Sequence, residues 1–309
     1  MALGIAAGNP TSSQVFTTEV FESQLIRKLY PSTLANTIFN HNFIKGLRAK
    51  GDSVHISQMN DVQIFEGVAG MSLMPTPVTY TKTSFVVDKL HFYYISMNNQ
   101  QAQQSKHEGG GLKYFAEQAA LQLQIKTDTI ALAAIPALVH ASNKGNKAGV
   151  LTGKLSLGTS GTPEIATRAS IYNILARMNT VLSEQNVPTA GRFAVLPPII
   201  MQLLKESEYR ISSVTGIAGV STMVNGLIGQ LAGLTLYESN LLKYTAVDDA
   251  FDCIFGTSEG GTIFTQLQET VFFDKLENSD GKAIRGSQLW GLGVTQPKFL
   301  GTAYLSPLL

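Results

Sequence analysis

The feature that most constrains the fold is a long run of strand-forming sequence that leads into the longest helical pattern of the chain. The segment Thr76–Met97, TPVTYTKTSFVVDKLHFYYISM, is rich in Val, Thr, Phe and Tyr, which favour strands. Together with Val62–Met74, and with a Gly, Met and Pro tip between them, it predicts a long protruding hairpin. Because an isolated hairpin is marginally stable in water, we expect this one to lie on another surface.

Two helices are predicted from apolar stripes. One covers Leu112–Ala134, and Pro136 is expected to end it. The other covers Thr167–Glu184. Its apolar face is formed by Ile171, Ile174, Leu175, Met178, Val181 and Leu182. A further helix is predicted over Thr17–Tyr30, immediately before a proline.

The remaining sequence predicts mostly strands. Ser53–Met59 alternates between apolar and polar residues, as a half-buried strand does. Gly191–Pro198 is typical of a buried strand that runs into a helix with proline in its first turn. Leu234–Leu242 predicts another strand. From Ala250 onward we expect strands broken by one short helix, with a turn at Asn278–Gly286.

A serine motif raises the alternative that the chain is an enzyme. Gly256–Gly260 matches the G-x-S-x-G nucleophile elbow of α/β-hydrolases, a strand–turn–helix with the serine at its tip. In that fold the histidine follows the serine, whereas no histidine follows Ser258 and no parallel βαβ series precedes it. The histidines are His41, His55, His91, His107 and His140. We interpret Ser258 as part of a turn between a strand and a short helix, and keep a serine hydrolase as the alternative from a different class.

The other chemical motifs are weaker. Gly149–Leu155 resembles a phosphate loop, but it is one residue short between its glycines and ends in leucine where magnesium needs a hydroxyl. Asp248, Asp249 and Asp252 form the densest acidic cluster, which we interpret as a solvated turn rather than a cation site. Cys253, the only cysteine, is expected to be buried. We therefore expect no catalytic residue, no metal and no cofactor.

Composition points away from an isolated monomer. Only 15% of the residues are charged, where about 25% is usual, so we expect neighbouring subunits to cover much of the surface. A plain Gly- and Ala-rich enzyme is the alternative. The net charge of +1 gives no electrostatic footprint for tight binding to duplex DNA. The charge-free run Ile211–Tyr237 has the length of a membrane span, but its five glycines disfavour a helix, so no membrane partner is expected.

The order of the predicted elements resembles that of one family. The order is a charge-free arm over Met1–Phe16, a helix, a long hairpin, a spine-like helix, a central α/β region and returning strands. It resembles the major capsid protein of tailed bacteriophages, the Hong Kong 97-type shell fold. The stretches that carry the resemblance are FVVDKLHFYYISMNNQQAQQS with the helix after it, GRFAVLPPIIMQLL, GLIGQLAGLTLYESNLL and LWGLGVTQPKFLGTAYL. The resemblance as a whole covers nearly the whole chain from about Thr17.

The resemblance implies an α+β fold with an N-terminal arm, an extended β-hairpin loop, a long spine helix, and peripheral and axial domains. The expected parts are 1–42, arm and first helix; 43–97, strand and hairpin loop; 98–140, spine helix; 141–247, axial domain; and 248–309, returning peripheral strands with a closing axial segment. In this family the stretch around Ser258 is a strand–turn–helix under the spine helix.

The resemblance also implies a function and partners. The expected function is structural: the chain forms pentamers and hexamers that close into an icosahedral shell around phage DNA, held non-specifically on the inner face. The expected locations are the virion capsid and, during assembly, the host cytoplasm. Because no long charged coiled segment precedes the arm, we expect a separate scaffolding protein, or none, and a portal protein. An encapsulin-type nanocompartment shell is the alternative with the same fold.

Three groups of residues are expected at contacts between subunits. They are the hairpin residues Phe65, Met71, Met74 and Tyr80; the ring-axis residues Gly216, Gly219 and Gly226; and Lys282 and Arg285 in a loop between rings. Some members of the family cross-link a hairpin lysine covalently, and Lys82 and Lys89 lie in the hairpin. No partner asparagine or catalytic glutamate is identified, so that chemistry is not assigned to this chain.

Overall fold

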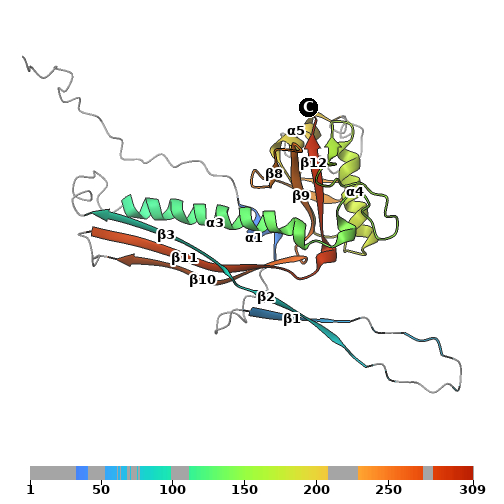
Figure 1. Ribbon diagram of the computed structural model, residues 1–309, viewed down its shortest axis with the longest axis horizontal. Coiled ribbons are helices and arrows are strands. Elements are labelled where there is room, and N and C mark those ends of the chain that lie inside the picture. The colour runs from blue at the N-terminus through green and yellow to red at the C-terminus, as the bar shows by residue number, and fades with distance from the viewer. Residues whose placement is uncertain are drawn as a thin grey trace, which may run out of the picture.

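A long helix, a rounded lobe and a protruding hairpin dominate the molecule (Figure 1). The computed structural model of the chain describes residues 33–40, 53–60, 62, 64–67, 70, 75, 77–98, 111–207, 229–273 and 281–308. In the elongated part, helix α3 (Gly111–Leu138) lies along a three-stranded sheet. The rounded lobe holds a seven-stranded sheet, and a two-stranded hairpin projects from the junction of the two parts. The fold is therefore α+β, as predicted.

The elongated part is one helix on one sheet. Its strands are β3 (Lys89–Asn98), β10 (Gly261–Phe273) and β11 (Gly281–Val294), paired antiparallel in the order β10-β11-β3. Side chains alternate between the two faces of such a sheet, and Trp290 of β11 packs with apolar residues of α3. The short helix α1 (Ala35–Ile38) packs against α3.

The rounded lobe is a mixed sheet with two helices. Its strand order is β4-β12-β9-β5-β7-β6, with β8 paired to β9. The strands are β4 (Glu164–Ala166), β5 (Arg192–Leu196), β6 (Gln230–Leu231), β7 (Leu234–Glu238), β8 (Tyr244–Thr245), β9 (Ala250–Thr257) and β12 (Leu300–Pro307). Helices α4 (Ile171–Glu184) and α5 (Pro198–Glu206) supply the apolar residues that cover it. Two short 3₁₀ helices, η3 (Ala141–Asn143) and η4 (Pro297–Phe299), lie in its connections.

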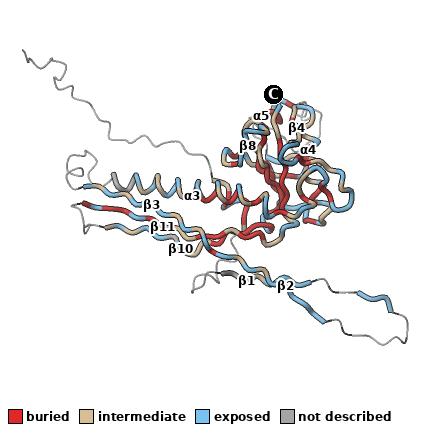
Figure 2. The backbone as a smooth tube through the Cα atoms, in the orientation of Figure 1, coloured by how far each residue is buried: buried red, intermediate tan, exposed pale blue. Residues whose placement is uncertain are grey.

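The buried core follows the same division. One apolar cluster fills the rounded lobe, and a second joins α1 and the C-terminal half of α3 to Trp290 and to strands of both sheets. Figure 2 shows most of the buried backbone in the lobe and at the junction, with a further buried stretch along β11, while the hairpin strands hold exposed and intermediate residues. Near the junction the base of the hairpin packs on the three-stranded sheet, where the Phe85 ring stacks on Phe264. The hairpin residues farther out are exposed.

Several predicted elements are confirmed. All six residues of the predicted apolar face of α4 are buried. β5 leads into α5, which has proline in its first turn. The predicted strand Ser53–Met59 is present as β1. The prediction that Pro136 ends the spine helix was wrong by two residues, because α3 continues to Leu138. The predicted helix Thr17–Tyr30 lies outside the described residues.

The predicted hairpin has different strands. β1 pairs with β2 (Tyr80–Val86), from Ser53 opposite Val86 to Met59 opposite Tyr80, and the described residues between 62 and 79 form no strand. The run Thr76–Met97 splits into β2 and β3, which belong to different sheets. At the split the chain crosses close over β11, where a Cβ on Gly291 would lie 2.6 Å from the Val86 carbonyl oxygen.

Two predictions for the C-terminal part were also wrong. The segment after Ser258 is strand β10, not a short helix, so the motif lies between two strands. Lys282 and Arg285 lie in strand β11, opposite Met97 and Tyr94 of β3, rather than in a loop. In both places the long antiparallel pairing between β10 and β11 overrides the local turn residues.

Candidate assembly surfaces

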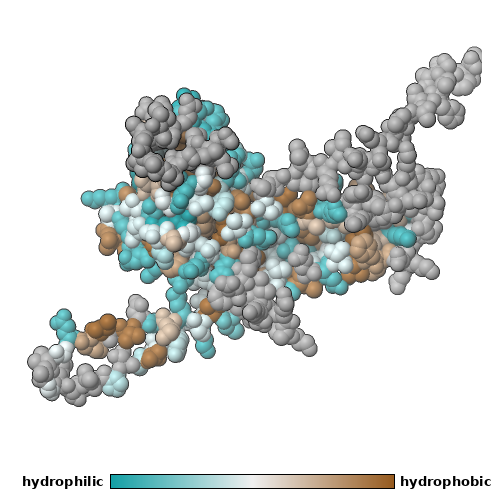
Figure 3. Space-filling model, turned by 180° about the vertical axis from the view of Figure 1, so that it is seen from behind, coloured by the Kyte–Doolittle hydropathy of each residue, from teal (hydrophilic) through white to brown (hydrophobic). Residues whose placement is uncertain are grey.

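The protruding hairpin carries a row of exposed apolar side chains, called here the hairpin surface. It consists of Met59, Val62, Ile64, Phe65, Val78 and Tyr80. Ile64 is 94% exposed and Phe65 is 67% exposed, values far above those of ordinary apolar side chains. Figure 3 shows brown hydrophobic atoms along this arm, away from the body of the molecule. Contiguous exposed apolar surface of this kind is typical of protein–protein contacts.

Hydrogen bonds at Asn60 fix the geometry where the paired strands end. The Asn60 backbone N–H donates to the Thr79 carbonyl oxygen at 3.2 Å. The Asn60 side-chain amide donates to Thr79 Oγ1 at 2.9 Å, and Thr81 Oγ1 donates to Asn60 Oδ1 at 2.8 Å. The arm beyond β1 and β2 therefore starts from a defined direction.

The three-stranded sheet provides a second surface, on the face that α3 does not cover. Cross-strand partners share a face, and Lys89 lies opposite Trp290, which packs with α3. The alternate residues of β3 therefore point away from the helix. This sheet surface consists of Leu90, Phe92 and Tyr94 of β3 and Leu267 of β10. Phe92 is 69% exposed, and within the described residues no element covers it.

The structure separates the residues that were predicted to make subunit contacts. Phe65 and Tyr80 are exposed on the hairpin surface, whereas Met71 and Met74 lie outside the described residues. The predicted ring-axis residues Gly216, Gly219 and Gly226 also lie outside them. Arg285 shares the face of Tyr94, and its guanidinium carbon lies 5.5 Å from the centre of the Phe273 ring.

Sequence reasoning missed the sheet surface. The sequence LHFYY carries the signal. Successive residues of a strand point to opposite faces, so consecutive apolar or aromatic residues predict a strand that is apolar on both faces. A helix covers one of these faces, and the other needs a partner. The segment was interpreted as one continuous return of the hairpin, and that interpretation concealed the change of sheet after Val87.

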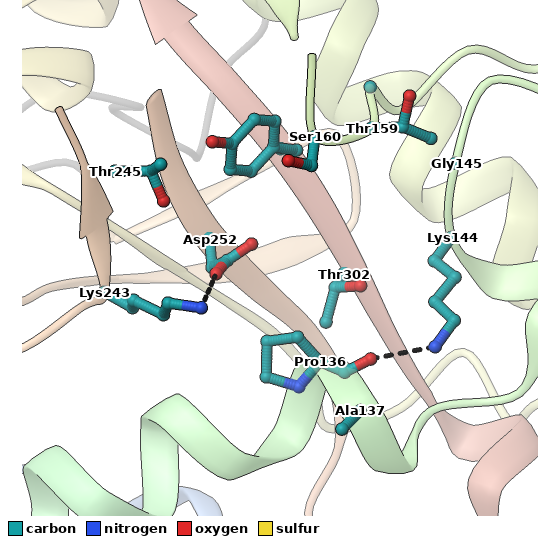
Figure 4. A pocket seen from close by; sticks show the side chains of 12 residues that line it. Pro136, Ala137, Lys144, Gly145, Thr159, Ser160, Lys243, Thr245, Asp252 and Thr302 are labelled. Atoms are coloured by element: carbon teal, nitrogen blue, oxygen red, sulfur yellow. Dashed lines mark hydrogen bonds and ion pairs between the residues drawn. The ribbon is translucent and has the colours of Figure 1, made fainter. Parts of the chain in front are cut away.

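The polar pocket at the junction of the two parts has a volume of about 570 Å³ (Figure 4). It lies between the end of α3, the segment after η3, and strands β9 and β12. Lys144 Nζ donates to the Pro136 carbonyl oxygen at 2.9 Å, and Lys243 Nζ lies 3.9 Å from the Asp252 carboxylate. The charged groups on its walls are thus already engaged with the protein itself, and they form no catalytic arrangement.

The three aspartates near this pocket, Asp248, Asp249 and Asp252, interact with different partners. Asp248 accepts bonds from the Gly161 backbone N–H at 2.9 Å and the Tyr304 hydroxyl at 2.8 Å, which lower its pKa. Asp249 accepts from the Tyr244 hydroxyl at 2.7 Å. Burial raises the pKa of Asp252, while Lys243 acts in the opposite direction. Among the described residues, no group of acidic, histidine or cysteine side chains has the arrangement of a metal site.

Ser258 is exposed in a tight turn between β9 and β10. The turn is closed by a hydrogen bond from the Gly260 N–H to the Thr257 carbonyl oxygen, 3.1 Å long. A nucleophile elbow needs a helix after the serine, and here a strand follows.

Within the described ranges, no helix has the length and apolar character needed to cross a membrane.

The comparisons with known proteins agree with this geometry. No sequence-family description and no curated protein matches the chain. A chain of Mycobacterium phage Che8 is 19% identical with a TM-score of 0.72, and the match covers 94% of this chain and 97% of that one. The capsid structure of Cyanophage P-SCSP1u is 14% identical with a TM-score of 0.72, covering 99% and 97%.

A protein shell of a different kind is also similar. The SrpI encapsulin complex from Synechococcus elongatus PCC 7942 is 9% identical with a TM-score of 0.57, and the match covers 94% of this chain and 92% of that one. These matches extend over the elongated part, the rounded lobe and the hairpin alike. The chain therefore has the Hong Kong 97-type fold that phage capsids and encapsulin shells share.

Proposed function

We propose that this chain is a major capsid protein of a tailed bacteriophage, a structural protein that self-assembles as pentamers and hexamers into an icosahedral shell. The observation that carries the proposal is the whole-length likeness to the cyanophage capsid, with 99% of the chain covered at a TM-score of 0.72. The hairpin surface and the sheet surface support it independently. Both are apolar and exposed, and they lie on or directly beyond the strands β1, β2 and β3 and on β10.

The energetics of these surfaces favour assembly. Burying apolar surface contributes about 25 cal/mol per Å², and obligate interfaces bury more than about 2,000 Å². Phe65 and Tyr80 would each contribute a large share of this area on the hairpin, because aromatic side chains bury the largest apolar surface. Many modest contacts around a closed shell then add up, since each subunit touches several neighbours.

The partners and the location follow from the proposed function. The main partner is the chain itself, with a separate scaffolding protein and a portal protein during assembly in the host cytoplasm. The finished shell is the virion capsid, and its net charge near neutral suits a wall that encloses double-stranded DNA without reading its sequence. Met71, Met74, Gly216, Gly219, Gly226, Lys282 and Arg285 remain proposed contact residues, and the five-part division of the chain remains a prediction.

An encapsulin-type shell is the second candidate, because an encapsulin complex has the same fold. Its TM-score of 0.57 is lower than the 0.72 of the Che8 and P-SCSP1u structures, which favours the phage function. A co-purifying enzyme cargo would support the encapsulin function, whereas a portal at one vertex would support the phage capsid.

The test is charge insertion on the hairpin surface. Phe65→Asp and Ile64→Asp place a carboxylate where an apolar contact is proposed, and we expect each variant to lose closed shells by negative-stain electron microscopy while keeping the circular dichroism of the folded subunit. Val247→Asp is the matched control, because Val247 is 93% exposed on the rounded lobe. Intact shells from both hairpin variants would contradict the proposed role of the hairpin. A wild-type chain that stays monomeric at millimolar concentration would contradict the proposed function itself.

A further inference from the structure

The contact between α3 and its sheet contains an unusual polar pair, His91 and Trp290, which define what we call the α3–sheet seam. Trp290 is the only tryptophan of the chain and is fully buried. Its indole Nε1–H donates a hydrogen bond of 3.2 Å to Nδ1 of His91. The centres of the two rings are 5.9 Å apart. The pair joins β11 to β3 on the face that α3 covers.

This hydrogen bond requires a neutral histidine. An imidazole nitrogen accepts a hydrogen bond only when it carries no proton, so Nδ1 is the acceptor and Nε2 carries the single proton. A protonated imidazole donates from both nitrogens. Protonation of His91 therefore removes the acceptor of a buried indole N–H, and an unpartnered buried donor is destabilising.

The charged groups around His91 oppose its protonation. Lys89, on the same strand and the same face, places its Nζ 5.7 Å from the centre of the Trp290 ring, and it also forms an ion pair with Asp88 at 3.0 Å. Lys126 acts on His91 from α3. From β11, the residue opposite His91 is the neutral Gln288. Burial, then Lys126, then Lys89 lower the pKa of His91.

We propose that His91 is a pH-sensitive switch in the α3–sheet seam, whose protonation releases the Trp290 indole and loosens α3 from β3 and β11. Three observations carry the proposal: the fixed acceptor role of Nδ1, the complete burial of its donor, and the two lysines beside it. The switch belongs to the folded subunit and holds whether or not the chain builds a shell. It therefore does not rest on the proposed function.

The direction of the effect follows from the lowered pKa. An unfolded chain has a histidine pKa of about 6.5, and the folded-state value for His91 lies below it. As the pH falls through about 6.5, the unfolded chain takes up the proton first, so the contribution of His91 to stability is complete above that pH and is lost below it. The packing of α3 on its sheet is thus most stable at neutral pH and is weakened in acid.

Trp290 itself reports the event, since it is the only tryptophan. We expect its fluorescence in the purified full chain to change as the pH falls from 7.5 to 4.5, with a midpoint below about 6.5. The variant His91→Gln offers a neutral acceptor oxygen that does not titrate in this range, so its emission should stay constant. His140→Gln is the matched control: the His140 side chain accepts from the Ser142 N–H, away from Trp290, and its variant should titrate like the wild type.

A second measurement tests the loosening of the helix. We expect hydrogen exchange of the α3 amides, corrected for intrinsic rates, to accelerate about tenfold in acid relative to α4, the equivalent of one lost buried hydrogen bond. Lys126→Gln keeps His91 and removes one charge that opposes its protonation, so the pH at the midpoint of the fluorescence change should rise by about 0.3 units. This variant tests the proposal even where His91→Gln does not fold. Wild-type emission that stays constant while the fold persists, or the same titration in His91→Gln, would overturn the proposal.

Discussion

Asp128 of α3 forms hydrogen bonds with the N-terminal end of α1, so its replacement by alanine should detach α1 from α3. The Asp128 Oδ2 atom accepts hydrogen bonds from the backbone N–H groups of Leu34, at 2.5 Å, and Ala35, at 3.1 Å. These are the groups at the start of α1 that have no partner within the helix. The carboxylate of one helix thus caps another that is distant in sequence.

The magnitude follows from these two bonds. Hydrogen bonds to a charged acceptor are worth about 1.5–3 kcal/mol each, and Asp128→Ala removes both. The loss is partly offset because the buried carboxylate is itself costly: burial raises the pKa of Asp128, although the N–H groups of Ala35 and Leu34 act in the opposite direction. We expect a net loss of about 2–3 kcal/mol in the free energy of unfolding, since Ile38 and Phe39 also lose part of their packing.

Urea unfolding followed by Trp290 fluorescence measures this loss, because Trp290 packs in the same apolar cluster as α1. Asp128→Asn is the matched control, since its amide oxygen still accepts from the α1 backbone, and it should lose much less. The raised pKa of Asp128 means that its contribution to stability is greatest in acid and falls as the pH rises through the folded-state value. This pH dependence should vanish in Asp128→Asn. A loss below about 0.5 kcal/mol in Asp128→Ala would refute the capping argument.

Two further predictions concern close packing. Gly286→Ala should destabilise the chain by about 1–3 kcal/mol in urea unfolding, because a Cβ there would lie 2.2 Å from the Tyr93 ring; Ser287→Ala, next along β11, is the control, and equal midpoints for the two variants would argue against it. Cys253 should resist thiol reagents at pH 8 in the native chain and react in urea, because burial, then Asp252, raises the pKa of its thiol. Fast labelling of the native chain would contradict this.

Local pattern predicted the parts of the fold that pack locally. The apolar stripe of Ile171–Glu184 predicted which residues of α4 are buried, because a helix shows its period within a few turns. The passage from β5 into α5 could also be predicted, since proline at the start of a helix is a local sequence signal. The hairpin was predicted in kind, and Phe65 and Tyr80 are exposed on it.

Pairing between strands that are distant in sequence could not be predicted from local sequence patterns. The run Thr76–Met97 divides into two strands where the chain crosses Gly291, about two hundred residues later, and the absence of a Cβ there permits the close approach. The residues after Ser258 are a strand because β11 pairs with them over their whole length. The Asp128 cap has no sequence signature either, because its partners are backbone groups of α1.

The direction of the hairpin decides how its apolar surface can be covered. In Figure 1, β3, β10 and β11 run away from the rounded lobe, whereas β1 and β2 leave the junction toward the opposite side. The hairpin surface of a subunit therefore does not reach its own sheet surface. A second copy whose hairpin met this subunit from outside would cover both surfaces, in a contact between two different patches. Such head-to-tail contacts generate closed rings when the rotation between copies closes. The pentamers and hexamers of the proposed shell would be rings of this kind, and the exposed surfaces suit that geometry.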